Sequence, residues 1–271
     1  MRDVVIAIPS FRRPKGLERL LGALEQLNTD AKVTVLVADN DAENCDAVQT
    51  CEAIRARGYR WPLDVVVEPK RGIANVRNAL VARVLEKHPC DFIAMVDDDE
   101  IPETRWLEQM LEMQAGTDAD AVGGTIRRVF ETDPGPWATH CDGVSDVLHP
   151  SGPIAMLEGT GNLLMRRALV ETLPAPWFDV AFSFTGGEDK DFFVRAKAAG
   201  AKFAWAGDAI IYDHVPPSRA NLKWALSRAY SAGNSDMRVF LRYRPSFSAQ
   251  LNEMARIVAA LLLNPVLFVI L

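Results

Sequence analysis

Short apolar runs alternate with helical patterns through the first hundred residues, and this alternation constrains the fold more than any other feature. Each run has the length of a buried strand, and apolar residues at helical spacing follow it. This β-α-β order predicts an α/β fold with a mostly parallel central sheet flanked by helices, whose ligands lie at the carboxyl ends of the strands. The predicted strands are residues 4–8, 33–37, 63–67 and 92–96, and helical spacing marks residues 17–27, 47–54 and 73–84.

The second half of the chain has a less regular pattern. Residues 131–157 are rich in Pro, Gly, Asp and His and predict a long loop or lid. Regular structure is expected to resume over 158–165. A helix over 189–200 and two strands over 202–205 and 209–212 are expected to follow. The nearly all-apolar segment 257–271 is shorter than the roughly 20 residues that cross a bilayer as a helix. It therefore predicts an interfacial segment or the start of a longer span.

Charge and cysteine content exclude several classes of protein. The net charge of −6 disfavours a nucleic-acid partner, which requires a basic face. Residues 216–271 nevertheless carry seven Lys and Arg against two acids, a local balance of +5. The cysteines have no metal-binding or disulfide spacing, and the N-terminal apolar run is too short for a signal peptide, so we expect a reduced, cytoplasmic compartment. These cysteines are Cys45, Cys51, Cys90 and Cys141.

Four consecutive acids, Asp97, Asp98, Asp99 and Glu100, follow the fourth predicted strand. Carboxylates crowded at the end of a buried strand raise one another's pKa unless a cation is present. Mg²⁺ or Mn²⁺ bound by one or two carboxylates together with substrate phosphates would relieve this repulsion. The alternative is a solvated acidic turn that caps a helix near Thr104.

Polar residues also follow the first and second predicted strands. Asp39 is placed to accept a hydrogen bond from a ribose or a base, although an Asp there can equally cap a helix. Pro9, Ser10 and Arg12 lie in a turn able to present backbone NH groups and a guanidinium group to a nucleotide. The sequence has neither the GxGxxG nor the GxxxxGK[ST] pattern, which disfavours a dehydrogenase and a P-loop enzyme.

Together these segments resemble the family 2 glycosyltransferases, which have the GT-A fold, and among them the bacterial enzymes that build exopolysaccharides. Residues 8–14 are similar to the opening nucleotide loop of that family, and 37–40 to its second-strand Asp segment. Residues 72–78 match its G-x-A-x-x-R-N segment, and 97–99 its DxD element. The resemblance extends over residues 4–219. It implies nucleotide binding by Pro9, Ser10, Arg12, Asp39, Arg77, Asp97, Asp98 and Arg219, and metal binding by Asp99, Asp97 and His214.

Residues 186–193 resemble the family's ED motif, which implies that Asp189 is the general base. The chemistry agrees, because an attacking hydroxyl must lose its proton and a carboxylate can accept it. The alternative is that the negative charges of Glu188 and Asp189 only stabilise the helix by interacting favourably with the dipole at its N-terminus. Paired glycines let a backbone approach a ligand closely, so Gly161 and Asn162 are expected to line a sugar or acceptor pocket, although a tight turn is also consistent with them. The same pocket is expected to include Gly187 and Glu188.

The resemblance implies an inverting transferase. Its donor would be a nucleotide-diphosphate sugar, with UDP the family-level expectation, and its acceptor a hydroxyl of a glycan or lipid-diphosphate-linked oligosaccharide. Residues 1–220 would form the GT-A domain, with a nucleotide-sugar half (1–100) and an acceptor half (101–220). Residues 221–271 would form a basic and apolar helical extension at the cytoplasmic face of the inner membrane.

Several alternatives remain open at this point. A sugar nucleotidyltransferase shares a related sheet, although the Gly-rich loop with which such enzymes open is absent. A catalytically inactive module that binds nucleotides or glycans is the alternative from another class. His214 can also be structural rather than a metal ligand.

Overall fold

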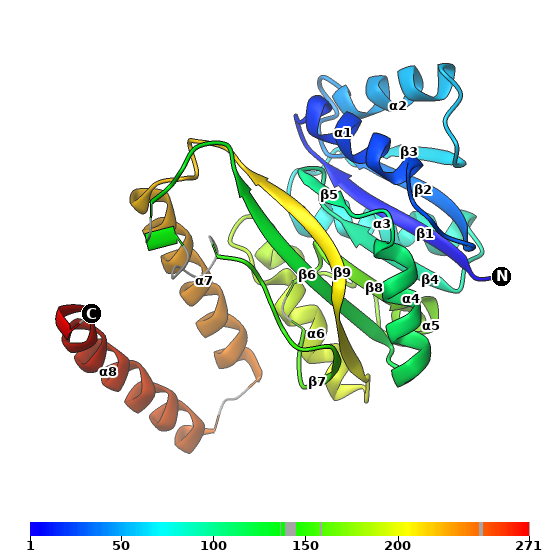
Figure 1. Ribbon diagram of the computed structural model, residues 1–271. Helices are drawn as coiled ribbons and strands as arrows, with labels where there is room; N and C mark the ends of the chain where they lie inside the picture. Colours follow the sequence, from blue (N-terminus) through cyan, green and yellow to red (C-terminus); the bar gives the residue numbers. More distant parts are fainter. Residues whose placement is uncertain (136, 139–144, 158, 244–245, 271) are drawn as a thin grey trace.

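The computed structural model describes residues 1–135, 137–138, 145–157, 159–243 and 246–270, with the backbone alone for 261–270. The described residues form one mixed sheet of nine strands with helices on both faces (Figure 1). The strand order is β3-β2-β1-β4-β8-β6-β9-β5, and β7 pairs with β9 off this path. This arrangement confirms the α/β prediction.

The first half of the sheet is parallel, as predicted, because helical crossovers separate its strands. Its strands are β1 (Asp3–Ser10), β2 (Lys32–Asp39), β3 (Leu63–Val67) and β4 (Phe92–Val96). Its helices are α1 (Pro14–Glu25), α2 (Asp46–Ala56) and α3 (Ile73–Lys87). The last residues of β1 and β2 pair in register, so their carboxyl ends reach the same edge of the sheet as the acids that follow β4.

The second half of the sheet is mixed, because β8 lies antiparallel between β4 and β6. Its strands are β5 (Glu100–Pro102), β6 (Ala121–Phe130), β7 (Gly152–Ile154), β8 (Asn162–Arg166) and β9 (Phe203–Val215). Its helices are α4 (Trp106–Thr117), α5 (Arg167–Thr172), α6 (Glu188–Ala198) and the short 3-10 helix η2 (Val180–Phe182).

The prediction of two strands over 202–205 and 209–212 was wrong, because β9 is continuous. Its pairing with β6 shifts between Gly124 and Ile126, which face Ala206 and Ile211, so β9 carries extra residues in a bulge. The bulge interrupts the alternation of apolar residues without ending the strand. The sequence therefore resembles two strands separated by a turn.

The predicted loop over 131–157 contains β7 and a bridge between Val147 and Ile126. β7 pairs with β9, and the bridge connects the loop to β6. Strand β6 was not predicted, because two buried glycines replace the expected apolar side chains. A Cβ on Gly123 would lie 2.8 Å from the Trp205 ring, and one on Gly124 would lie 2.5 Å from the Ala209 carbonyl oxygen. These glycines let β9 approach closely. Glu158, where regular structure was expected to resume, lies outside the described residues.

The hydrophobic core has one layer on each face of the sheet. Side chains of α1, α2 and α4 pack on one face, and those of α3, α5 and α6 pack on the other. Cys45, Cys51 and Cys90 are free thiols, while Cys141 lies outside the described residues. The carboxyl ends of β1, β2 and β4 lie at one edge of the sheet between these two layers.

Two long helices, α7 (Leu222–Tyr243) and α8 (Phe247–Ile270), follow β9 and lie at the side of the molecule away from α1 and α2 (Figure 1). α7 contacts α6. α8 carries exposed large apolar side chains. A search of the described residues finds no helix whose length and apolar character together suffice for a membrane span.

Candidate active site

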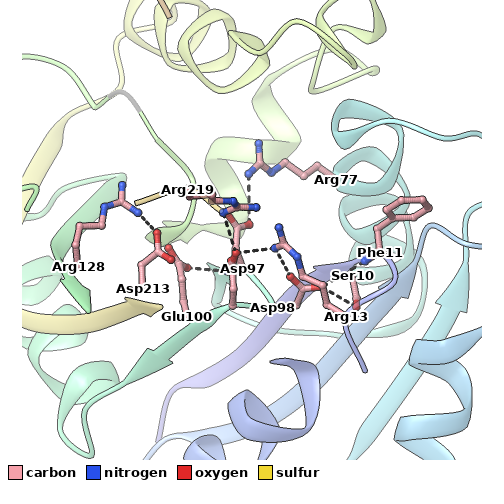
Figure 2. A network of polar contacts seen from close by, with 11 residues as sticks. Ser10, Phe11, Arg13, Arg77, Asp97, Asp98, Glu100, Arg128, Asp213 and Arg219 are labelled. Atoms are coloured by element: carbon pink, nitrogen blue, oxygen red, sulfur yellow. Dashed lines mark hydrogen bonds and ion pairs between the residues drawn. The ribbon is translucent and has the colours of Figure 1, made fainter. Parts of the chain in front are cut away.

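Asp98 is one of two buried members of the acidic run after β4 (Figure 2), the other being Glu100. Its carboxylate accepts hydrogen bonds from the Ser10 hydroxyl at 2.8 Å and the Phe11 amide at 3.3 Å. Arg13 Nη1 lies 3.0 Å from its second oxygen. Burial raises the pKa of Asp98 to about 6, although Arg13 and Ser10 oppose the shift. Asp98 thus anchors the loop after β1 to the end of β4.

Asp97 and Asp99 lie on either side of Asp98 and remain more accessible to solvent. Arg13 Nη1 is 2.7 Å from Asp99, and Arg219 Nη1 is 3.5 Å from the same oxygen. Arg77 Nη2 is 3.5 Å from Asp97. Burial raises the pKa of Asp97, and Asp99 adds to the shift. Three arginines from distant parts of the chain thus converge on two carboxylates.

Glu100 is buried at the start of β5, and its carboxylate accepts a hydrogen bond from the Asp97 amide at 2.8 Å. Burial raises its pKa well above the usual range. Glu100 pairs in register with Asp213 of β9, which forms an ion pair with Arg128. A Cβ on Gly161 would lie 2.7 Å from Glu100 Oε1, so the predicted pocket residue Gly161 leaves room for this carboxyl group.

Arg77 connects the acidic run to α6. Its buried guanidinium group pairs with Glu188 as well as with Asp97. Burial and Asp189 raise the pKa of Glu188, and Arg77 opposes the shift. The half-buried Asp189 follows Glu188 in the first turn of α6. The ion pair therefore brings the predicted base into the neighbourhood of the acidic run.

Asp97 and Asp99 offer oxygen ligands suited to Mg²⁺ or Mn²⁺, which commonly use one or two carboxylates together with substrate phosphates. Within the described part of the chain, no group of three or more His, Cys, Asp or Glu side chains could hold a metal ion. His214 lies on β9, where its amide donates a long hydrogen bond of 3.4 Å to the Asp99 carbonyl oxygen. Asp97 and Asp99 are the two accessible carboxylates at this edge that could bind an ion shared with phosphates.

The nucleotide loop predicted after β1 directs its two arginines differently. Arg12 has a positive φ of 55°, and its guanidinium group pairs with Asp41 at 2.6 Å and Glu43 at 3.3 Å. Arg13, which the sequence analysis did not select, contacts the acidic run instead. Adjacent arginines are equivalent in sequence, and only the backbone conformation at Arg12 separates them. Pro9 and Ser10 end β1, and the Ser10 hydroxyl binds Asp98.

Asp39 is fully buried at the end of β2. One carboxylate oxygen accepts from the amides of Ala47 and Val48 at the start of α2, and the other accepts from the Asp41 amide. The side chain therefore has the helix-capping contacts of the alternative interpretation. The neighbouring Asn40 bonds the backbone of Glu68, Lys70 and Gly72 and so fixes the loop before α3.

The predicted pocket residues lie in different environments. Asn162 is buried, accepts a hydrogen bond from Trp106 Nε1 at 2.7 Å, and donates to the carbonyl oxygens of Thr125 and Ala209. These contacts give it a structural role inside the sheet. Gly187 immediately precedes α6, and its φ of 99° favours glycine.

Contacts from α7 hold the segment that leads into α6, and no sequence motif marks them. The Ser235 hydroxyl donates to the Thr185 carbonyl oxygen at 2.7 Å, and Arg238 Nη1 donates to the Thr185 hydroxyl at 2.8 Å. Tyr243 Oη donates at 2.6 Å to Asp191, which is fully buried. α7 therefore braces the start of the helix that carries Asp189.

The chain is similar in sequence to a known protein family and to individual relatives. Residues 5–173 match the family described as glycosyl transferase family 2. The succinoglycan biosynthesis protein ExoM of Rhizobium meliloti is 31% identical over 243 residues, which are 86% of this chain and 74% of that protein. The pre-mycofactocin glycosyltransferase of Mycobacterium tuberculosis is 27% identical, over 86% of this chain and 47% of that protein.

Solved structures of S. aureus TarS share the fold. The 1–349 fragment in complex with UDP has a TM-score of 0.60 and 18% identity, covering 80% of this chain and 61% of that one. Its complex with UDP-GlcNAc has a TM-score of 0.57 and 17% identity, over 79% of this chain and 59% of that one. The chain thus spans less than two thirds of these structures and about half of the mycobacterial relative.

Proposed function

This chain belongs to glycosyl transferase family 2, and from that premise we propose that it transfers a sugar from a nucleotide-diphosphate donor to a hydroxyl of a glycan or lipid-linked oligosaccharide, with inversion. The observation that carries the proposal is the Arg77 bridge. It links Asp97, at the carboxyl edge of the sheet, to Glu188, the neighbour of Asp189. A donor-binding edge and a candidate base are thereby held together.

The donor would lie over the ends of β1, β2 and β4, as ligands of parallel sheets generally do. UDP is the nucleotide that we propose, supported by the UDP and UDP-GlcNAc complexes of the structurally similar TarS. Arg219, with its guanidinium group at the acidic run, would bind the diphosphate. The relation to a succinoglycan biosynthesis protein supports a role in polysaccharide synthesis.

The transfer would depend on Mn²⁺ or Mg²⁺ held by Asp99 and Asp97, with His214 a further candidate ligand. A bound ion of this kind stabilises the negative charge of the departing diphosphate. The position of Asp97 supports this proposal, because burial and the neighbouring Asp99 raise its pKa and a bound cation would favour its charged form.

Asp189 would accept the proton of the attacking hydroxyl. Its position in the first turn of α6, partly exposed beside the buried Glu188, supports this role. A single displacement with this base requires no covalent enzyme intermediate and inverts the anomeric centre. Asp191, another acid of the same turn, is fully buried and bonded to Tyr243 and Arg195, which disfavours it as the base.

We further propose that the protein works at the cytoplasmic face of the membrane, where lipid-diphosphate-linked acceptors are available. Large apolar side chains are exposed along α8, and basic residues outnumber acids over 216–271. Apolar burial and attraction to anionic lipids together can hold a protein at an interface.

A thermal-shift screen of nucleotide diphosphates with and without Mn²⁺ tests the donor site, because a ligand specific for the folded state raises the melting temperature. UDP with Mn²⁺ should stabilise the protein more than either alone. Asp99→Ala should lose the Mn²⁺-dependent part of this stabilisation and all transfer while remaining folded. Full turnover of Asp99→Ala in the presence of a chelator would contradict the metal assignment.

Slow hydrolysis of a UDP-sugar with Mn²⁺ would distinguish an enzyme from an inactive binding module. Family membership favours sugar transfer over the nucleotidyl transfer that the sheet alone allows.

A further inference from the structure

Arg13 has two carboxylate partners although it lies at the accessible edge of the site. Its Nη1 atom lies 2.7 Å from Asp99 and 3.0 Å from Asp98, and 40% of its side chain is exposed. Asp98 also has the Ser10 hydroxyl and the Phe11 amide as partners, so it does not depend on Arg13 alone. Asp99, in contrast, has its side-chain contacts with Arg13 and Arg219.

We propose that Arg13 exchanges partners during the catalytic cycle: without donor it neutralises Asp99, and with donor it binds the diphosphate. This inference rests on the proposed function and adds a binding residue to it. An arginine stays charged at any pH at which the protein is folded, so a cation always accompanies Asp99 in the donor-free state. A divalent ion arriving alone must therefore compete with a guanidinium group for the same oxygen.

A diphosphate changes this competition. It offers Arg13 several anionic oxygens in place of one, and a guanidinium group binds such oxygens strongly. Asp99 is then free to bind the metal ion together with those phosphates. Arg13 would thereby make metal binding weak in the absence of nucleotide and strong in its presence.

The neighbouring Arg12 provides a matched control. It adjoins Arg13 in the chain and is similarly exposed, but it pairs with Asp41 and Glu43. Removing it should leave the affinity of Asp99 for metal alone unchanged. A general change in charge of the loop would affect the two variants equally, whereas the proposed exchange predicts an effect for Arg13 only.

The first measurement is Mn²⁺ binding to the full chain without nucleotide. The EPR signal of free Mn²⁺ reports how much of the ion remains unbound. Arg13→Ala should bind Mn²⁺ about two- to fivefold more tightly than the wild type, because loss of a half-exposed ion pair removes a competitor of that strength. Arg12→Ala should match the wild type. Arg13→Gln, which keeps a polar side chain without the charge, should change in the same direction as Arg13→Ala.

The second measurement is UDP binding at saturating Mn²⁺ by calorimetry. Here Arg13→Ala should bind about tenfold more weakly, because one charged phosphate contact is lost. Tighter binding of Mn²⁺ alone together with weaker binding of UDP by Arg13→Ala would identify the exchange. Unchanged or weaker Mn²⁺ binding by both Arg13 variants, or unchanged UDP affinity, would overturn the proposal. If wild-type protein failed to bind UDP, the proposed function would fail, while the Mn²⁺ comparison would still report whether Arg13 competes for Asp99.

Discussion

Asp98 is a buried member of the acidic run whose ionisation should affect folding. Its folded-state pKa of about 6 exceeds the value of about 3.9 in unfolded chains, because burial penalises the charged carboxylate. The folded protein therefore holds this proton more tightly. Its stabilising contribution is complete below about pH 4 and is lost as the pH rises through about 6.

This shift predicts the pH dependence of stability. In metal-free buffer the free energy of unfolding of the wild type should fall, relative to that of Asp98→Asn, by about 2–3 kcal/mol between pH 4 and pH 7. Urea titrations of both proteins across this range measure the difference, and their comparison cancels the other titrating groups. A difference that stays constant with pH would show that Asp98 ionises as an exposed carboxyl does.

Asp189 carries the proton-transfer prediction. Asp189→Asn keeps the shape of the side chain but cannot accept the proton, so turnover should fall about 10²-fold or more while the affinity for UDP changes little. Steady-state rates and calorimetry separate these two quantities. Asp208→Asn, at an exposed position in the bulge of β9, should retain turnover. A collapse of UDP affinity in Asp189→Asn would instead identify a binding residue and direct the search for the base to Glu188.

At the scale of elements, α7 and α6 form one structural unit. The polar contacts of Ser235, Arg238 and Tyr243 join α7 to the segment from Thr185 to Asp191. Buried carboxylates such as that of Asp191 are costly unless their hydrogen bonds are satisfied. Residues of α7 therefore contribute to the stability of the site although they lie beyond the matched region 5–173.

Tyr243→Phe tests this coupling. Loss of the hydroxyl removes a donor from the buried Asp191 carboxylate and should lower the free energy of unfolding by about 1–3 kcal/mol. Tyr230→Phe is the matched control, because Tyr230 lies on the same helix and is 79% exposed. Removal of its hydroxyl should change the free energy of unfolding little. Urea unfolding measures both. Equal stability of the two variants would mean that α7 does not support α6.

At the scale of the whole molecule, α8 differs from the body of the protein. Its large apolar side chains Phe247, Leu251, Met254 and Val258 are exposed and recur at spacings of three and four residues. Such a stripe on a helix beside basic residues is typical of interfacial binding. The alternative is that the segment packs on protein.

Liposome flotation distinguishes these alternatives. The full chain should float with vesicles that contain anionic lipid, and less so at high salt, because the electrostatic attraction is screened. Removal of residues 257–271 should weaken flotation while sparing donor hydrolysis. If the full chain ignores anionic vesicles at low salt, or if the truncated chain unfolds, the segment is part of the protein core.

The sequence by itself determined the α/β architecture and the edge at which the site lies. Apolar periodicity is a local property, and it identified the strands of β1 to β4 before their pairing was known. Parallel strands end at one edge of a sheet, so the acids after β4 were expected beside the loop after β1. The bulge in β9 and the glycines of β6 escaped this reasoning, because close approach between strands leaves no periodic signal.

Only the tertiary structure decided which polar residues meet. Arg77 and Glu188 lie 111 positions apart, and their pairing depends on the tertiary arrangement that brings α3 to the start of α6. A left-handed backbone at Arg12 decides that Arg13 contacts Asp99, and the start of α2 decides that Asp39 caps a helix. Residue type fixes what a side chain can bind. Which partner that side chain meets depends on backbone dihedrals and on packing, which bring distant segments within about 3 Å. No local sequence pattern encodes such a contact.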